Sequence, residues 1–260
     1  MIHIDNISFR YSPDKWVISN LDFRIAYFSW TVITGPDASG KTTLAKLIKG
    51  LLNPQRGSVS FTDSRRSLTD QIGFLCGNSS SSIVGITVLD DICFGMENLR
   101  VSQSEMRKRV ETVLRWTGLT GFENRLTHTL SGGERQKLAL AGALAIGNKI
   151  LILDEAFSML DNVSRNDARD LVRDLKGKLD LTIIEMTNRA REISSADMIF
   201  FLGPGGKLEF AGPPVQFLFS ALGSEWTAPQ GGLYGLLSAL PGEEINQVEN
   251  LIGQLGIRLA

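Results

Sequence analysis

The chain has 260 residues, 43% of them hydrophobic, and its formal net charge is −1. This length fits one large α/β domain, or one domain with an inserted subdomain, and the apolar fraction is sufficient for a full core. The charge argues against broad nucleic-acid binding, which needs a basic surface. No apolar run approaches the ~20 residues of a membrane span, and two cysteines do not make a disulfide framework.

Strand-like and helix-like segments alternate along the chain. Strands are expected where apolar and polar residues alternate or where a short apolar run ends in a turn, and helices where apolar residues recur every three or four positions. In chain order, we expect strands at 2–10, 17–26 and 30–34, a helix at 44–49, strands at 58–61 and 71–76, helices at 102–117 and 134–147, a strand at 149–153, a helix at 164–178, and strands at 181–185 and 198–202.

This order of elements predicts an α/β domain over residues 1–222, with an antiparallel β part at its N-terminal end. Because residues 102–147 have helical period between strand-rich flanks, we expect a mostly helical subdomain, at about 74–148, to be inserted into the core. Residues 223–260 begin with a glycine-rich stretch and continue with apolar residues at helical spacing, which predicts a linker and a short helix.

A glycine-rich loop follows the strand at 30–34. Its sequence, G-P-D-A-S-G-K-T-T, matches G-x-x-x-x-G-K-[ST] between a strand and a helix, which is the pattern of a phosphate-binding P-loop. Backbone amides of such a loop face phosphate oxygens, Lys41 brings charge to the β- and γ-phosphates, and Thr42 offers a hydroxyl to Mg²⁺. Asp37 is unusual, because a carboxylate here either points to solvent or weakens phosphate affinity. The nucleotide-binding residues expected in this loop are Gly35, Pro36, Asp37, Ala38, Ser39, Gly40, Lys41, Thr42 and Thr43.

Two carboxylates end the apolar strand I-L-I-L at 150–153. Ligands of α/β sheets bind at the C-terminal ends of the strands. Downstream of a P-loop, Asp154 is therefore expected to hold Mg²⁺ through water, together with Thr42, and Glu155 is expected to polarise the attacking water. An acidic strand end alone is common, so this prediction depends on the P-loop before it.

A third motif, L-S-G-G-E-R-Q, opens the helix expected at 134–147. Ser131, Gly132 and Gly133 can present a hydroxyl, backbone amides and the positive end of the helix dipole to an anion. An ordinary helix start is the alternative, because serine is a good N-cap and Gly-Gly is a plain turn.

Taken together, these motifs resemble the ATP-binding cassette (ABC) ATPases. The P-loop, L-S-G-G-E-R-Q, I-L-I-L-D-E and S-M-L-D at 158–161 follow in the family's order over about residues 1–220. The resemblance implies ATP and Mg²⁺ as cofactors, and a head-to-tail dimer in which each ATP lies between one P-loop and the partner's L-S-G-G-E-R-Q signature. It also implies that Tyr11 stacks on adenine, although a plain turn tyrosine is the alternative.

A narrower resemblance points to one kind of transporter. The segments V-G-I-T-V-L-D-D at 84–91 and F-G-M-E-N at 94–98 are similar to the ATPases of energy-coupling factor transporters, which take up vitamins, cobalt or nickel. This resemblance implies a second ATPase subunit, expected to be a different chain, and a transmembrane transporter subunit, with this chain on the cytoplasmic face of the cell membrane.

Two other kinds of function remain open. One is a nucleotide-gated interaction subunit that hydrolyses ATP slowly or not at all. The other is a soluble ABC protein of DNA repair or translation. Such proteins usually carry two cassettes, a coiled-coil insertion or a zinc module, and the chain shows none of these. Its charge is also unsuited to nucleic acid, so no nucleic-acid partner is expected.

Two positions depart from the family. Gly77 stands where the family has a glutamine, and Gln71, six residues upstream, lies roughly 20 Å away at the rise of a strand. Asn188 stands at the catalytic position where the family has a histidine, and asparagine can hydrogen-bond but cannot titrate. Because the signature is intact, these departures predict a degenerate site on this chain and a competent site that its signature completes on a partner.

Overall fold

The structure is a computed structural model, and it describes residues 1–62, 72–77, 83–193 and 196–227. The short helix expected near the C-terminus lies outside the described residues, and so does Gln71. Within these ranges, no helix combines the length and the apolar character needed to cross a membrane.

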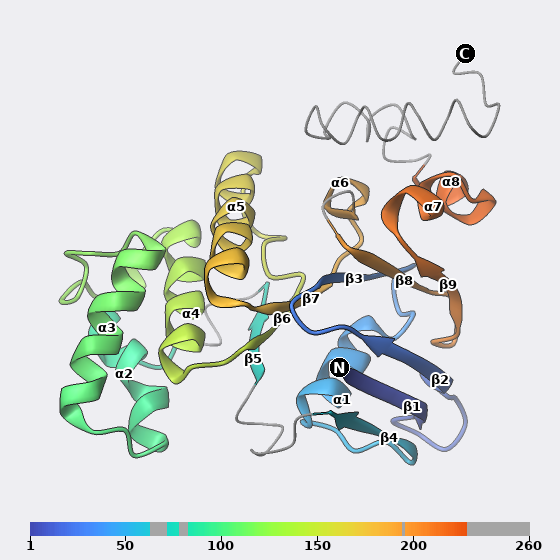
Figure 1. Cartoon of the computed structure of the whole chain (residues 1–260), viewed down its shortest axis with the longest axis horizontal. Coiled ribbons are helices and arrows are strands. Elements are labelled where there is room, and N and C mark those ends of the chain that lie inside the picture. The colour runs from blue at the N-terminus through green and yellow to red at the C-terminus, as the bar shows by residue number, and fades with distance from the viewer. Residues whose placement is uncertain (63–71, 78–82, 194–195, 228–260) are drawn as a thin grey trace.

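A six-stranded sheet forms the centre of the fold (Figure 1). Neighbouring strands are parallel, except that β9 pairs antiparallel with β8. Every residue of β3, β6 and β7 is buried, as expected for parallel strands covered on both faces. In spatial order the strands are β5 (Ile72–Cys76), β6 (Ile150–Asp154), β7 (Thr182–Met186), β3 (Trp30–Thr34), β8 (Met198–Leu202) and β9 (Leu208–Gly212).

One face of this sheet is covered by α1 (Lys41–Lys49) and by a three-stranded antiparallel sheet. That second sheet consists of β2 (Ile18–Ile25), β1 (Ile2–Phe9) and β4 (Arg56–Phe61), in this order. Apolar side chains of both sheets and of α1 form one buried cluster that includes Ile4, Leu44 and Ile152. The predicted α/β class with an N-terminal antiparallel part is thereby confirmed.

Three helices lie together to one side of the core sheet, next to β5 (Figure 1). They are α2 (Val88–Asn98), α3 (Gln103–Thr117) and α4 (Gly132–Ile146). The parallel pairing of β5 with β6 holds residues 74–76 in the core sheet, although we expected the helical subdomain to begin at about 74. Helix α2 was not among the expected helices, but Thr87 begins it with a capping box to Asp90, which is a signal in the sequence.

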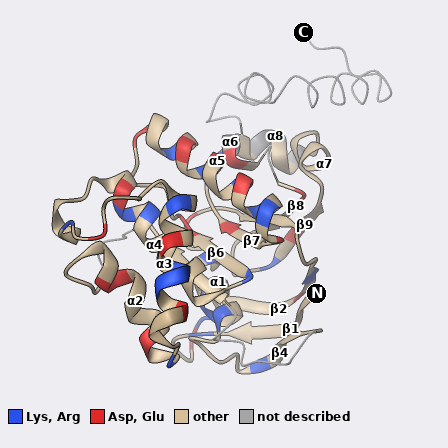
Figure 2. Ribbon diagram, turned by 60° about the vertical axis from the view of Figure 1, so that its left-hand side comes forward, with Lys and Arg blue, Asp and Glu red and all other residues tan. Residues whose placement is uncertain are grey.

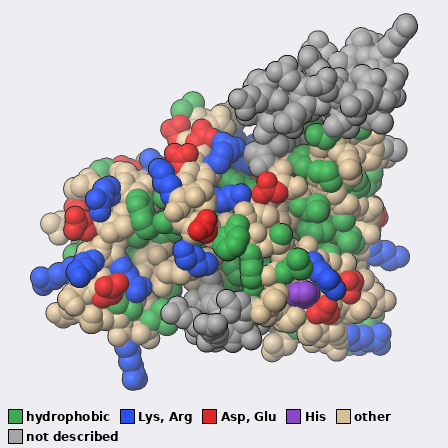
Figure 3. All heavy atoms as spheres, in the orientation of Figure 1, with side chains coloured by type: hydrophobic (Ala, Val, Ile, Leu, Met, Phe, Trp, Pro, Cys, Tyr) green, Lys and Arg blue, Asp and Glu red, His purple; other side chains and the backbone are tan. Residues whose placement is uncertain are grey.

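Helix α5 (Asn162–Leu179) covers the second face of the core sheet, and basic and acidic residues alternate along it (Figure 2). The chain then forms β7, the short α6 (Ala190–Ile193), β8 and β9, and it continues into α7 (Pro214–Leu218) and α8 (Ala221–Thr227). Hydrophobic side chains gather where β8, β9 and α7 lie on the face shown in Figure 3. Ring contacts of Phe217 with Phe201, Phe210 and Trp226 hold these C-terminal helices on the edge of the core sheet.

Candidate functional site

The P-loop connects the end of β3 to the start of α1. Gly35 has a φ of 143°, and a Cβ on it would lie 2.0 Å from the carbonyl oxygen of Leu202, so only glycine fits there. The Nζ of Lys41 donates hydrogen bonds to the carbonyl oxygens of Gly35 and Pro36, at 2.9 Å each. No acidic residue occupies the first turn of α1, so its positive dipole end favours an anion at the loop.

Thr42 and Asp154 meet where α1 begins and β6 ends. The Thr42 hydroxyl donates a hydrogen bond of 3.1 Å to Oδ1 of Asp154. Burial raises the pKa of Asp154, and the hydrogen bond from Thr42 partly opposes that rise. A hydroxyl and a carboxylate are hard oxygen ligands of the kind that Mg²⁺ prefers, and Mg²⁺ usually takes only one or two protein ligands beside phosphate and water. The pair therefore fits a magnesium ion bound together with a nucleotide.

Three carboxylates influence the charge state of Lys41. Its pKa is lowered mainly by burial, whereas the charges of Asp37, Glu155 and Asp154 raise it. Glu155 itself is exposed, has a φ of 48°, and donates its backbone N–H to the carbonyl oxygen of Met186 at 2.9 Å. The structure thus brings the P-loop lysine and the acidic pair at the end of β6 into one electrostatic neighbourhood.

Gly77 directly follows β5 and faces the turn after β6. A Cβ at this position would lie 2.7 Å from the carbonyl oxygen of Glu155 and 2.7 Å from Oγ of Ser158. Real Cβ atoms do not approach a backbone oxygen so closely, so a side chain at position 77 would push the backbone away from Glu155. The glycine is therefore a requirement of local packing at this position.

Asn188 lies just after β7 and contacts the P-loop. Its Nδ2 donates a short hydrogen bond to Oδ1 of Asp37, 151 residues earlier in the chain. The exposed Asp37 carboxylate therefore turns toward Asn188, and it is also the first of the charges that raise the pKa of Lys41. Sequence reasoning had left the direction of this carboxylate open.

Tyr11 lies beside the first turn of α1. Its hydroxyl is 3.3 Å from Oγ1 of Thr43, and its ring meets the Phe9 ring edge-on at 4.9 Å between centroids. The side chain is 63% exposed, so one face of the ring is accessible to a planar ligand next to the P-loop.

The signature segment begins α4, in the helical part of the fold. Ser131 accepts a hydrogen bond from the backbone of Glu134 at 3.2 Å, and the Glu134 carboxylate accepts from the backbone of Ser131 at 2.6 Å. This reciprocal capping box shows that Ser131 serves as an ordinary N-cap in the isolated chain. Gly132 and Gly133 lie near Leu160 and Ser164, so the signature adjoins the loop that follows β6.

One arginine of α5 holds that loop, residues 155–161, by hydrogen bonds to its backbone. Arg165 donates from Nε to the carbonyl oxygen of Phe157 at 3.0 Å, and its guanidinium also reaches the carbonyl oxygens of Ser158 and Leu160. Met159, at the loop's tip, is 80% exposed. The loop thus presents a large apolar side chain outward on a backbone that the fold holds in place.

Sequence reasoning missed a buried charged cluster behind these loops. It joins Glu185 of β7, Arg169 of α5 and Glu192, which lies five residues after Thr187. The signal that could have revealed it is the glutamate within the mostly apolar strand T-I-I-E-M, because a buried carboxylate in a core strand needs a partner.

Known proteins resemble this chain over most of its length. A family model described as ABC transporter matches residues 18–158. The chain is 36% identical over 224 residues to the energy-coupling factor transporter ATP-binding protein EcfA1 of Oceanobacillus iheyensis, which covers 84% of this chain and 80% of that relative. It is 37% identical, with the same coverage, to the protein of the same name from Levilactobacillus brevis.

Solved structures show the same fold. The CbiO1 protein of Clostridium perfringens, described as part of the ABC transporter complex cbiONQ, matches with a TM-score of 0.78 at 25% identity, over 92% of this chain and 98% of that one. A bacterial Atm1-family ABC exporter with ATP bound matches with a TM-score of 0.75 at 25% identity, over 89% of this chain and 42% of that one.

Proposed function

Because the chain belongs to the ABC transporter family, as an ATP-binding subunit of the energy-coupling factor kind, we propose that it works in a head-to-tail dimer with a second ATPase. In this proposal its own nucleotide site is degenerate, and its signature completes the site of the partner. The partner is a different chain that supplies a complete P-loop site.

The nucleotide is held by the P-loop and the elements around it. Lys41 and the N-terminal amides of α1 bind the β- and γ-phosphates, and the exposed ring of Tyr11 stacks on adenine. Thr42 and Asp154 would hold Mg²⁺, which neutralises charge on the phosphates when it is bound. Glu155 orients the attacking water from the end of β6, and Asn188 hydrogen-bonds to the terminal phosphate.

One observation carries the proposal that this site is degenerate. Gly77 is packed so closely against the backbone of Glu155 that a side chain does not fit, and the other departing position is an asparagine that cannot titrate. Two groups that would surround the γ-phosphate are thereby lost or changed. The retained Glu155 supports a slow residual turnover at the same site.

The signature supports a role on the partner's nucleotide. Ser131 is exposed at the start of α4, so its hydroxyl is accessible to a partner's nucleotide, although the Glu134 carboxylate already accepts the Ser131 backbone N–H at this end of the helix. The exposed Met159 on the neighbouring loop provides an apolar contact for a second ATPase.

The membrane subunit is proposed to dock beside α2. Val84, Ile86 and Phe94 are 62%, 72% and 45% exposed there. Val84 and Phe94 line a cavity of about 430 Å³ together with Phe74 of β5 and Ile146 of α4. An exposed apolar region of this kind indicates a protein contact. This contact would hold the chain on the cytoplasmic face of the membrane.

The decisive experiment compares Ser131→Ala with Glu155→Ala in the complex assembled with the partner ATPase. If the partner's site performs the turnover, Ser131→Ala should abolish most ATP hydrolysis, and Glu155→Ala should reduce it little. Loss of an oriented catalytic group typically costs about 10²–10⁴-fold in rate, so the two outcomes are easily separated.

Ser131→Ala also removes a helix cap, which costs about 1 kcal/mol of stability. The matched control is Ser102→Ala, because Ser102 caps α3 in the same way by accepting from the backbone of Glu105. This control should lose similar stability and keep its turnover. The reverse pattern, in which Glu155→Ala abolishes hydrolysis and Ser131→Ala does not, would contradict the proposal. If the assembled parent complex and all its variants bind nucleotide but show no turnover, the alternative function, a nucleotide-gated interaction subunit, would be favoured.

A further inference from the structure

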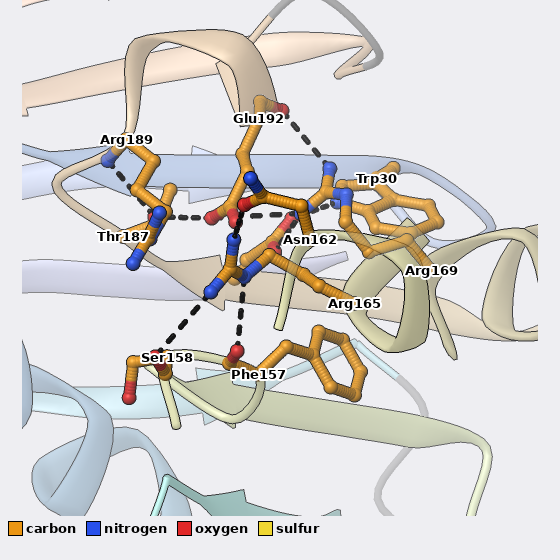
Figure 4. A network of polar contacts seen from close by, with 10 residues as sticks. Trp30, Phe157, Ser158, Asn162, Arg165, Arg169, Thr187, Arg189 and Glu192 are labelled. Atoms are coloured by element: carbon orange, nitrogen blue, oxygen red, sulfur yellow. Dashed lines mark hydrogen bonds and ion pairs between the residues drawn. The ribbon is translucent and has the colours of Figure 1, made fainter. Parts of the chain in front are cut away.

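Three charged side chains are buried together between α5, β7 and the segment after β7, and Figure 4 shows Arg169 and Glu192 among their polar contacts. Arg169, Glu185 and Glu192 are only 6%, 3% and 8% exposed. The Arg169 guanidinium is ion-paired with the Glu185 carboxylate, donates to the carbonyl oxygen of Glu192 at 3.1 Å, and lies 3.7 Å from the Glu192 carboxylate. Trp30 donates from Nε1 to the second oxygen of Glu185 at 2.8 Å.

Stability alone does not account for this cluster. A buried ion pair pays a large desolvation cost, and apolar residues of similar volume at such sites are often at least as stabilising. Burial raises the pKa of Glu185 to about 7, although the charge of Arg169 lowers it. A carboxyl group is thus buried in the core strand β7 at a cost, next to the segment that carries Asn188.

A direct chain of hydrogen bonds links the cluster to that segment. The hydroxyl of Thr187, which is 3% exposed, donates to the carboxylate of Glu192 and accepts from the backbone N–H of Arg189 at 3.1 Å. Asn188 lies between Thr187 and Arg189, so the hydrogen bond between these two residues holds the backbone on either side of it. Its side chain then reaches Asp37 of the P-loop.

The same face of α5 also supports the loop after β6. Arg165 and Arg169 are one helical turn apart and point to the same side. Arg165 donates a hydrogen bond to the carbonyl oxygen of Phe157. Burial lowers the pKa of Arg165, and the charge of Glu192 opposes this lowering. The segments that follow β6 and β7 are therefore both fixed to one helix by two guanidinium groups.

We propose that Thr187 and Glu192, held by Arg169, are positioning residues that fix Asn188 toward the terminal phosphate, so that this chain distinguishes ATP from ADP. This inference rests on the proposed nucleotide site. The amide of Asn188 donates to the Asp37 carboxylate at the P-loop and is proposed to contact only the γ-phosphate, which ADP lacks, whereas Lys41 and the N-terminal amides of α1 also reach the β-phosphate that both nucleotides share. Loss of the Thr187 hydroxyl therefore affects ATP alone.

The test measures the Kd of Mg-ATP and of Mg-ADP for the full chain by calorimetry. Thr187→Val keeps the volume and removes the hydroxyl, and Thr187→Ser keeps the hydroxyl. We expect Thr187→Val to weaken the binding of ATP about tenfold and that of ADP less than about twofold. The reason is that a misplaced Asn188 loses one hydrogen bond to the charged terminal phosphate, which only ATP has. Thr187→Ser should retain the ratio of the two affinities. Equal weakening of ATP and ADP, or an unchanged ratio, would overturn the inference.

A second variant covers the case in which Thr187→Val does not fold. Glu192→Gln preserves an acceptor for Thr187 but removes the charge that faces Arg169, and it should also lower the affinity for ATP selectively. If Thr187→Val does not fold and Glu192→Gln leaves the ratio of the ATP and ADP affinities unchanged, the inference is likewise overturned. Lys41→Ala separates this inference from the proposed site. If Lys41→Ala leaves both affinities unchanged, the nucleotide site is wrong. If Lys41→Ala weakens both and Thr187→Val leaves their ratio unchanged, only the positioning role fails.

Discussion

The side-chain amide of Asn188 donates a hydrogen bond to the carboxylate of Asp37, and so joins the segment after β7 to the P-loop. In this arrangement the Asp37 carboxylate accepts a hydrogen bond from the Asn188 amide, which a phosphate oxygen could also accept. The same carboxylate raises the pKa of Lys41 and so stabilises its charged form. Asp37 is therefore a negative group that competes with the nucleotide for two of its proposed partners.

Replacement of Asp37 by asparagine should increase the affinity for ATP several-fold. The change removes a negative charge near the phosphates, and a pair of charges a few ångströms apart near a protein surface interacts with a few kcal/mol before screening. Isothermal titration at two salt concentrations measures the effect, which should be smaller at high salt. Asp174→Asn, an exposed position on α5, is the control and should leave the affinity unchanged. Weaker ATP binding by Asp37→Asn would show that the carboxylate helps the site.

Lys41→Ala should weaken both ATP and ADP. Its ammonium group folds over the loop at 2.9 Å from two carbonyl oxygens, and a hydrogen bond to a charged group is worth about 1.5–3 kcal/mol. This range corresponds to roughly ten- to 150-fold in Kd. Lys178→Ala, which removes an exposed lysine of α5, should bind both nucleotides like the parent chain. Unchanged binding by Lys41→Ala would contradict the P-loop assignment.

Gly77→Gln should destabilise the chain and should not restore rapid hydrolysis. The new Cβ would lie 2.7 Å from the carbonyl oxygen of Glu155, so the backbone must shift, at a cost of about 1–3 kcal/mol typical of overpacking. Thermal unfolding measures the loss. Gly177→Gln on α5 is the matched control, because nothing lies within 4 Å of its added Cβ, and glutamine is a better helix former than glycine. Unaltered stability of Gly77→Gln together with faster turnover would show that the turn accommodates a side chain.

The buried Glu185 should make stability depend on pH. Its pKa is raised from 4.5 to about 7, so between these values the folded chain binds more protons than the unfolded chain. The free energy of unfolding should therefore fall as pH rises from about 4.5 to about 7, by up to about 3 kcal/mol for this group. Arg169 of α5 and Glu192 face the carboxylate, and Trp30 of β3 hydrogen-bonds to it.

Urea unfolding at several pH values checks this prediction. Glu185→Gln should flatten the slope between pH 4.5 and 7, because its side chain does not titrate. Glu111→Gln, at an exposed position on α3, should keep the slope of the parent chain. The same slope in Glu185→Gln and in the parent would assign the pH dependence to other groups.

Much of the candidate site could be read from residue order, because its motifs are local. A P-loop requires consecutive residues between a strand and a helix, and a capping box needs two residues three positions apart. Glu134 and Ser131 meet this requirement within a single turn of α4. Helix α2 had the same kind of signal at Thr87. Apolar residues in the loop before Thr87 continue into the helix, so the hydrophobic pattern alone does not mark where α2 begins.

The contacts between distant segments could not be predicted in this way. β3 and β7 are neighbours and parallel, so their C-terminal ends bring Asp37 and Asn188 together across 151 residues. The close approach that excludes a side chain at Gly77 likewise depends on the pairing of β5 with β6. Periodicity and motif spacing identify elements and local chemistry, because both arise from neighbours along the chain. The order of the strands, and with it the partners of Asn188, Gly77 and Glu185, depends on how all elements bury their apolar faces at once.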